Sequence, residues 1–273
     1  MNRNQLKIAV MSNAGGTGKT TLTVNLANEL SLVGHSVCAF GLDPNASLGM
    51  FLGLSQPDSE SLGNILLNED FSGEWPLHDC WPSRSTKVQA CLGGRDLDAS
   101  IEKLLVADRK TEVLRDRLED YPLPHDFLIF DCPGTVDLMH KIALSACDFV
   151  LISVCPDAKG FYAVATLLDW FYTNIRRLRL RPAPEILGVV PNRVQAIEQH
   201  QAVLGLKRKD EIPPLPDLLA ASNIHLFEPI KEYAEISKSV MEGGLPLRAY
   251  RPGHPANKPF HNIATVLIEK RDA

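Results

Sequence analysis

Short apolar runs that alternate with helical patterns organise this chain. Runs of four to six mostly apolar residues cover positions 8–11, 36–40, 127–130, 149–154 and 186–190. Runs of this length and composition are typical of strands buried on both faces of a parallel sheet. Apolar residues recur every three or four positions, as on the buried face of a helix, in residues 22–30, 161–171, 233–241 and 260–268. Strands alternating with helices predict an α/β fold with a doubly wound, mostly parallel sheet.

The region from residue 46 to residue 125 has weaker patterns. Residues 61–67 predict a short helix, and residues 97–118 have the apolar spacing of one longer helix. Residues 71–85 combine two tryptophans with prolines and polar residues, which predicts an irregular connection whose rings form a small satellite core. A further short strand is expected at residues 224–227.

Composition is typical of a soluble globular protein. The chain has 273 residues, 45% of them apolar and 22% charged, and no linker, repeat or low-complexity tract divides it. We therefore expect a single domain over residues 1–273. A polar N-terminus and the lack of an apolar run of about 18 residues predict neither a signal peptide nor a membrane span. Six cysteines without a C-x-x-C pair indicate buried thiols in a cytoplasmic protein.

The net charge of −5 argues against a protein that binds nucleic acid with its whole surface. The net charge does not argue against a local basic face that binds nucleic acid. The candidate DNA-binding residues are Arg176, Arg177, Arg179, Arg181, Lys207, Arg208, Lys209, Arg248 and Arg251. Such clusters bind phosphates without reading bases, although solvated charge near a helix end explains each residue equally well. No recognition helix or zinc pattern predicts sequence-specific binding.

Residues 12–21, Ser-Asn-Ala-Gly-Gly-Thr-Gly-Lys-Thr-Thr, carry the strongest chemical signal. A predicted strand precedes them and a predicted helix follows, which is the context of a phosphate-binding loop rather than of an ordinary glycine-rich turn. Glycines let backbone N–H groups converge on phosphate oxygens at the positive end of the helix dipole. Lys19 would neutralise the β- and γ-phosphates of ATP, and the Thr20 hydroxyl would coordinate Mg²⁺. The predicted nucleotide-binding residues of this loop are Gly15, Gly16, Thr17, Gly18, Lys19, Thr20 and Thr21.

Two aspartates follow predicted strands. Asp43 precedes a proline, and Asp131 ends the apolar run 127–130. The carboxyl ends of parallel strands meet at the edge where the loop lies, so both carboxylates are expected near the phosphates. Asp131 would hold the Mg²⁺ shell, and Asp43 would orient water or bind Mg²⁺ through water. The alternative for Asp43 is a structural Asp-Pro turn. A strand that ends in aspartate is common, so Asp131 indicates a magnesium site only in combination with the phosphate loop.

The phosphate loop, Asp43-Pro44 and Asp131-Cys132-Pro133 together resemble the ParA/MinD family of deviant Walker P-loop ATPases. In that family a lysine stands just before the first glycine of the loop and reaches the ATP of the partner subunit. This chain has Ala14 there. The resemblance places Lys159 at a strand-to-helix loop that faces the partner, where it is a candidate for a trans-acting lysine. A solvated lysine is an equally good interpretation.

The resemblance also implies roles for single residues. Asp43 would position the attacking water and, with Lys19, form the catalytic pair. Asn192, at the end of a predicted strand, would hydrogen-bond the adenine edge. Pro229 would lie in the loop that closes over the base.

A cycle follows from the resemblance. ATP would bridge two copies of the chain, the homodimer would bind nucleoid DNA without sequence preference, and an adaptor on a cargo would stimulate hydrolysis. Loss of the usual lysine resembles the carboxysome-positioning members, called McdA. The alternatives are a plasmid or chromosome partition ATPase and a membrane-associated switch of the MinD type. The lack of a basic amphipathic C-terminal tail argues against the last, so no membrane partner is expected.

Overall fold

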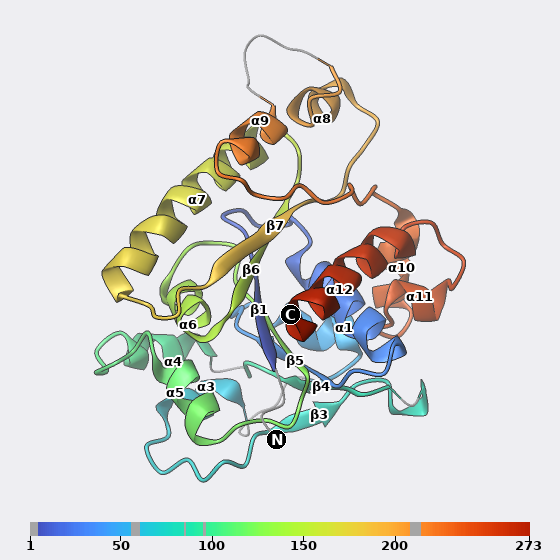
Figure 1. Ribbon diagram of the computed structural model, residues 1–273. Coiled ribbons are helices and arrows are strands. Elements are labelled where there is room, and N and C mark those ends of the chain that lie inside the picture. The colour runs from blue at the N-terminus through green and yellow to red at the C-terminus, as the bar shows by residue number, and fades with distance from the viewer. Residues whose placement is uncertain (1–4, 56–60, 85, 95–96, 208–213) are drawn as a thin grey trace.

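A computed structural model describes residues 5–55, 61–84, 86–94, 97–207 and 214–273. In these residues seven strands form one sheet in the order β3-β4-β2-β5-β1-β6-β7 (Figure 1). All neighbours pair in parallel except β3, which is antiparallel to β4. The strands are β1 (Leu6–Met11), β2 (Val37–Gly41), β3 (Leu77–Asp79), β4 (Val88–Cys91), β5 (Phe127–Asp131), β6 (Phe149–Val154) and β7 (Glu185–Pro191).

Side chains alternate between the two faces of each strand, and the alternation builds two cores. In β1, Ala9 and Met11 belong to one core, and Ile8 and Val10 belong to the other. This is why the strand sequence is apolar without interruption: both faces are covered.

Helices supply the two covers (Figure 1). The face with Ile8 is covered by α1 (Lys19–Leu32), α2 (Ser47–Leu52), α10 (Ala234–Met241), α11 (Leu247–Tyr250) and α12 (Asn257–Asp272). The other face is covered by α3 (Leu62–Leu67), α4 (Leu97–Leu104), α5 (Val113–Asp120), α6 (Leu138–Ala146) and α7 (Ala158–Leu178), with α8 (Glu198–Val203) and α9 (Leu215–Ala220) beside α7. No helix in the described ranges has the length and apolar character that crossing a membrane requires.

The C-terminal helices are attached to α1 by an ion pair between the half-buried Arg248 and the buried Glu29. Glu29 of α1 is almost fully buried and accepts hydrogen bonds from Arg248 Nε at 2.5 Å and from an Arg248 terminal nitrogen at 2.9 Å. At the C-terminal end of α12, a terminal nitrogen of Arg271 donates to Asp126 Oδ1 at 2.7 Å. A buried carboxylate needs such a partner, because burial without one is costly. The charge of Arg248 is therefore satisfied inside the fold.

Three predictions for the less regular segments were wrong. The helix expected over 97–118 is two helices, because the backbone turns at Arg109, which has a positive φ of 52° and forms an ion pair with Asp116 at 2.8 Å. The irregular connection over 71–85 contains β3 and a 3-10 turn at Pro82–Arg84. The strand expected over 224–227 makes only an isolated bridge to β7.

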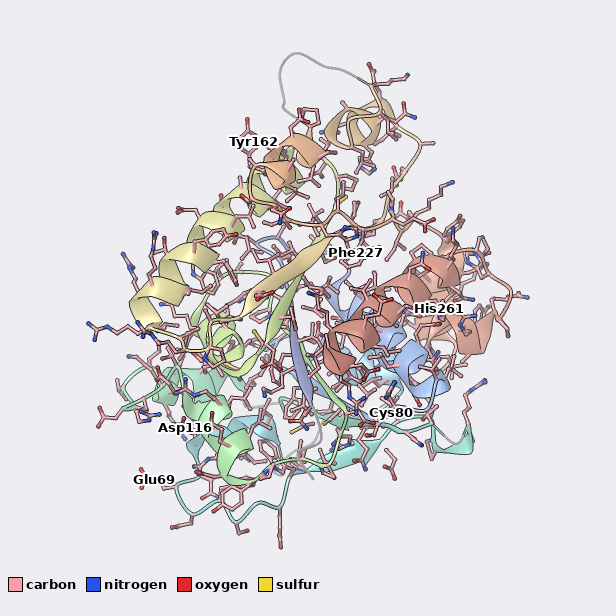
Figure 2. All side chains as sticks on the ribbon, in the orientation of Figure 1. Glu69, Cys80, Asp116, Tyr162, Phe227 and His261 are labelled. Atoms are coloured by element: carbon pink, nitrogen blue, oxygen red, sulfur yellow. The ribbon has the colours of Figure 1, made fainter. Side chains whose placement is uncertain are left out.

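Packing explains why residues 224–227 nevertheless lie along β7. Phe227 is buried against Gly188 of β7, where a Cβ atom would stand 2.6 Å from Phe227 Cε2 (Figure 2). The missing side chain of Gly188 makes room for the ring.

Candidate nucleotide-binding site

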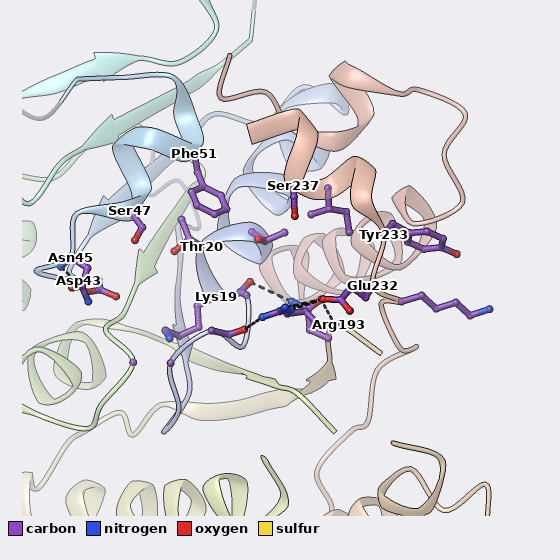
Figure 3. Close-up of a pocket in the computed structure, with 18 residues that line it drawn as sticks. Lys19, Thr20, Asp43, Asn45, Ser47, Phe51, Arg193, Glu232, Tyr233 and Ser237 are labelled. Atoms are coloured by element: carbon purple, nitrogen blue, oxygen red, sulfur yellow. Dashed lines mark hydrogen bonds and ion pairs between the residues drawn. The ribbon is translucent and has the colours of Figure 1, made fainter. Parts of the chain in front are cut away.

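A cavity of about 510 Å³ opens where the carboxyl ends of the strands meet α1 and α10. Its loop half is lined by Gly15, Gly16, Gly18, Lys19, Thr20, Thr21, Asp43, Asn45 and Gly134. Its C-terminal half is lined by Asn192, Arg193, Lys231, Glu232, Tyr233, Ile236 and Ser237, with Ser47 and Phe51 of α2 completing the rim. Figure 3 shows Asp43 and Asn45 on one side of Lys19, and Glu232 and Tyr233 on the other.

The backbone of residues 15–18 turns through left-handed conformations that glycine adopts without strain. Gly16 has φ 73° and Gly18 has φ 85°. Gly18 also caps the N-terminus of α1, whose first helical residue is Lys19. The first N–H groups of a helix have no partner inside it, so they are available to an anion at this end.

Lys19 is 6% exposed, and its ammonium donates to Ser12 Oγ at 3.1 Å. The same oxygen accepts from Thr17 Oγ1 at 3.1 Å and donates to the carbonyl oxygen of Ala14 at 2.7 Å. None of the described carboxylates forms an ion pair with Lys19. A buried ammonium held by a neutral hydroxyl favours an anionic ligand at this place.

Asp131 is fully buried beside this lysine. Its Oδ2 accepts from Thr20 Oγ1 at 2.8 Å, whereas its Oδ1 has no hydrogen-bond partner among the described residues. Burial raises the pKa of Asp131 to about 7, although the Thr20 hydrogen bond and the Lys19 ammonium lower it; the Asp43 carboxylate adds a smaller increase. An unpartnered buried carboxylate oxygen next to a threonine hydroxyl is a hard-oxygen donor set that suits Mg²⁺. Thr20 and Asp131 therefore fit the predicted magnesium site.

Asp43 lies in the loop half, as the sequence predicted. Its Oδ1 accepts from the backbone N–H and from the side-chain amide of Asn45, each at 2.9 Å. The loop after β5 approaches from another side: a Cβ on Gly134 would stand 3.1 Å from Gly15 Cα. Strand-end carboxylates and the segment after Asp131 thus meet around the phosphate loop.

The carbonyl oxygen of Thr17 accepts two side-chain hydrogen bonds from neighbouring strands. Ser153 Oγ of β6 donates to it at 2.8 Å, and Asn192 Nδ2, just after β7, donates to it at 3.0 Å. Sequence reasoning had not singled out Ser153. The available signal was a hydroxyl inside the apolar run 149–154, where a buried polar group needs a partner.

The C-terminal half was largely missed as well. A terminal nitrogen of Arg193 donates to the carbonyl oxygen of Gly16 at 3.0 Å, and another forms an ion pair with Glu232 at 2.8 Å (Figure 3). Gln195 also donates to Glu232, and the hydrogen bonds from Gln195 and Arg193 lower the pKa of that carboxyl. Arg193 has a positive φ of 55°, a strained backbone that is common at functional sites.

Several predicted residues lie outside the cavity. Pro229 is exposed and does not line it. Lys159 is exposed in the first turn of α7, where the preceding cap residue Asp157 accepts from Gly160 N at 2.6 Å. The basic candidates Arg176, Arg177, Arg179, Arg181, Lys207 and Arg251 are exposed, Arg248 is paired with Glu29, and Arg208 and Lys209 lie outside the described residues.

Comparison with known proteins decides the family. The AAA_31 family model, described as an AAA domain, matches residues 5–183. The chromosome partitioning protein ParA of Caulobacter vibrioides is 31% identical over 204 residues, which are 70% of this chain and 70% of that protein. The chain belongs to the ParA/MinD family of deviant Walker P-loop ATPases. A second ParA, from Myxococcus xanthus, is 29% identical over 67% of this chain and 63% of its own length.

The matched segments thus span less than two thirds of the length of the first curated relatives, at 63 to 65%. Solved structures share the fold of this family over nearly the whole chain. Apo McdA of Cyanothece has a TM-score of 0.80 at 21% identity, covering 96% of this chain and 99% of that one. The cell division ATPase MinD of Pyrococcus furiosus has a TM-score of 0.71 at 26% identity, covering 97% and 98%.

Proposed function

We propose that this chain binds ATP with Mg²⁺ in the cavity, hydrolyses the γ-phosphate and uses the cycle to position a cargo. The observation that carries the proposal is the conjunction of two incompletely bonded charged groups, Lys19 in the loop half and Asp131 beside it. Lys19 has a buried ammonium with no described carboxylate within ion-pair distance, and Asp131 Oδ1 is buried with no hydrogen-bond partner among the described residues. A magnesium-bound triphosphate supplies both partners at once.

In this proposal, different residues bind the phosphates, the Mg²⁺ ion and the attacking water. Lys19 exchanges its bond to Ser12 for phosphate oxygens, and the N–H groups at the start of α1 bind the same group. Thr20 and Asp131 hold Mg²⁺, which when bound neutralises phosphate charge. Asp43 orients the attacking water, and its bonds to Asn45 fix the carboxylate for that task.

Dimerisation is the second part of the proposal. Ala14 stands where the family has its trans-acting lysine, so the partner's phosphates lack that charge. A small cavity lined by Ala14 and Gly160 places the N-terminus of α7 directly behind the loop. Lys159 is exposed one residue before Gly160, and we propose that it reaches the ATP of the second copy.

DNA binding is the third part. Arg176, Arg177, Arg179 and Arg181 are all exposed around the C-terminal end of α7. The helix has 21 residues, and at a rise of about 1.5 Å per residue Arg176 and Arg177 lie about 26 Å from Lys159 along its axis. A surface so far from the cavity can hold DNA phosphates while nucleotide occupies the site. Arg248 is left out of this surface because Glu29 already neutralises it.

The cargo is the least determined part. The fold shared with McdA and the missing lysine favour a carboxysome-type cargo that is distributed over the nucleoid through an adaptor protein. The ParA relatives favour a second candidate, a plasmid or chromosome partition ATPase with the same chemistry. A MinD-type membrane switch is the third and least supported.

Retention on DNA separates the first two candidates from the membrane switch. We expect the chain to bind non-specific duplex DNA at low salt with ATP, and to release it with ADP or at high salt. The double variant Arg176→Glu, Arg177→Glu should lose DNA retention but keep ATP turnover, whereas Arg84→Glu, an exposed arginine elsewhere, should change neither. Binding to anionic liposomes without binding to DNA would favour the membrane switch and contradict the proposal.

A further inference from the structure

We propose that Ser153 and Asn192 are positioning residues that hold the phosphate loop in its nucleotide-binding shape by tethering one carbonyl group, that of Thr17. The inference rests on the proposed binding of ATP. It assigns to Asn192 a role different from the adenine contact that the family resemblance implied.

The two donors come from different strands and converge on one atom. Ser153 is 1% exposed and Asn192 2% exposed, and they donate to the Thr17 carbonyl oxygen at 2.8 Å and 3.0 Å. A carbonyl oxygen has two lone pairs, so both are used. The loop is therefore attached on its inner side to β6 and to the end of β7.

The side chain of Asn192 has its hydrogen-bonding groups engaged within the fold. Its Nδ2 donates to Thr17 and lies 3.5 Å from the carbonyl oxygen of Gly18, and its Oδ1 accepts from the N–H of Arg193 at 2.9 Å. A nucleobase atom that accepts from the amide would have to displace these contacts, and only the second lone pair of Oδ1 is left for a donor.

Gly18 is shaped by the same contact. A Cβ atom at this position would stand 2.2 Å from Asn192 Nδ2, far inside contact distance. The glycine is required here for a second reason besides its positive φ: it admits the tethering amide.

The tether has a consequence for phosphate binding. Within one trans peptide, the carbonyl of Thr17 and the N–H of Gly18 point in opposite directions. Fixing the carbonyl towards Ser153 and Asn192 therefore fixes the Gly18 N–H on the other side, and Gly18 lines the cavity. An N–H group aimed before the ligand arrives costs less ordering on binding.

The two roles of Asn192 make different predictions for two probes. A base-reading residue affects ATP but not inorganic tripolyphosphate, which has no base. A tether affects both to the same degree, because each uses the loop. The ratio of the two affinities thus separates the two roles. A general loss of stability would also lower both affinities equally, so the affinities are compared only for variants that a thermal melt shows to be folded at the assay temperature, and the hydroxyl-retaining variant Ser153→Thr separates the tether from a packing effect.

The experiment measures dissociation constants of the full chain for ATP and for tripolyphosphate, each with Mg²⁺, by calorimetry. We expect Asn192→Ala and Ser153→Ala each to weaken both probes by about 5- to 10-fold, the range for one lost hydrogen bond. Ser153→Thr, which keeps the hydroxyl, should stay within about twofold of wild type. Ser145→Ala is the matched control, because its hydroxyl donates to the carbonyl of Lys141, away from the loop, and it should change neither affinity.

Two results would overturn the tether. One is an Asn192→Ala variant that loses ATP affinity while its tripolyphosphate affinity stays at the wild-type value. The other is a folded Ser153→Ala variant with both affinities unchanged, and this variant decides the matter should Asn192→Ala fail to fold. A wild-type chain that binds neither probe would instead contradict the proposed function itself.

Discussion

The loop half and the C-terminal half of the cavity meet over Lys19, but they are built differently. The loop half comes from residues 15–21 and from the ends of strands next to β1, so the sheet itself positions it. The C-terminal half comes from Asn192 and Arg193 and from the segment 231–237. The two segments are joined by an isolated β-bridge between Val194 and Lys231 and by the bonds of Arg193 and Gln195 to Glu232.

The charges of the two halves differ as well. In the loop half, the buried Lys19 ammonium has no described carboxylate within ion-pair distance, and beside it the buried Asp131 Oδ1 has no hydrogen-bond partner among the described residues. In the C-terminal half, Arg193 and Glu232 are paired with each other at 2.8 Å. The charged groups on the loop side therefore lack partners that an anionic ligand with its metal would supply, whereas Arg193 and Glu232 in the C-terminal half already neutralise each other. The affinity for phosphate should therefore depend mainly on the first half and, in the second, on Asn192, which donates to the Thr17 carbonyl of the loop.

The largest expected effect concerns turnover. Asp43→Ala should keep ATP affinity within about twofold and lower the rate of phosphate release by about 100- to 1,000-fold, because the attacking water loses the carboxylate that orients it. A phosphate-release assay beside a binding isotherm measures both. Equal turnover in the variant and the wild type would remove Asp43 from the reaction.

The next effect concerns binding to the loop half. Lys19→Ala removes charge-assisted hydrogen bonds and should weaken both ATP and tripolyphosphate by about 100-fold. Lys103→Ala, an exposed lysine of α4, is the control and should leave both affinities unchanged. Undiminished tripolyphosphate binding by Lys19→Ala would mean that the phosphates bind elsewhere.

A smaller effect concerns dimerisation and tests whether Lys159 of one copy reaches the ATP bound in the loop half of the other. In the Asp43→Ala background, which preserves ATP, Lys159→Ala should weaken dimerisation by about 10-fold while the monomer binds ATP as before. Sedimentation at a series of protein concentrations gives the dimer constant. A dimer constant equal to that of the parent variant would leave Lys159 as a solvated lysine.

The smallest effect is on stability without nucleotide. The folded-state pKa of Asp131, about 7, lies above the value of an unfolded chain, so wild-type stability should fall as pH rises from about 4 to about 7 and then level off. Asp131→Asn lacks this loss and should melt a few degrees higher than wild type at pH 8, with little difference at pH 4.

Thermal melts across this pH range provide the measurement. Asp108→Asn, an exposed aspartate in the turn after α4, should follow the wild-type curve. If the difference in melting temperature between Asp131→Asn and wild type were the same at every pH, ionisation of the buried Asp131 carboxyl would not destabilise the fold.

The difference between the halves also explains what the sequence could predict. Strands covered on both faces must be apolar throughout, and a phosphate loop must place its glycines and lysine within a few residues, so β1, β5, β6 and the loop were readable. Asp43 and Asp131 followed because parallel strands end at one edge. These features depend on residues that are close in sequence or on sheet geometry alone.

Other features depend on contacts that no local pattern encodes. β4 contains Gln89 and is a strand because β2 and β3 pair with it on either side. Glu232 becomes part of the cavity only through its pairing with Arg193, 39 positions earlier. The sequence predicts Arg248 to be a surface charge, but in the structure α11 places it beside Glu29, with which it forms an ion pair.

The most direct test of the central claim is a crystal structure of the Asp43→Ala variant with ATP and Mg²⁺. The account predicts a triphosphate against residues 15–21, with Lys19 Nζ moved from Ser12 to phosphate oxygens and Mg²⁺ beside Thr20 and Asp131. A loop free of phosphate at saturating ATP, with Lys19 still bonded to Ser12, would contradict it.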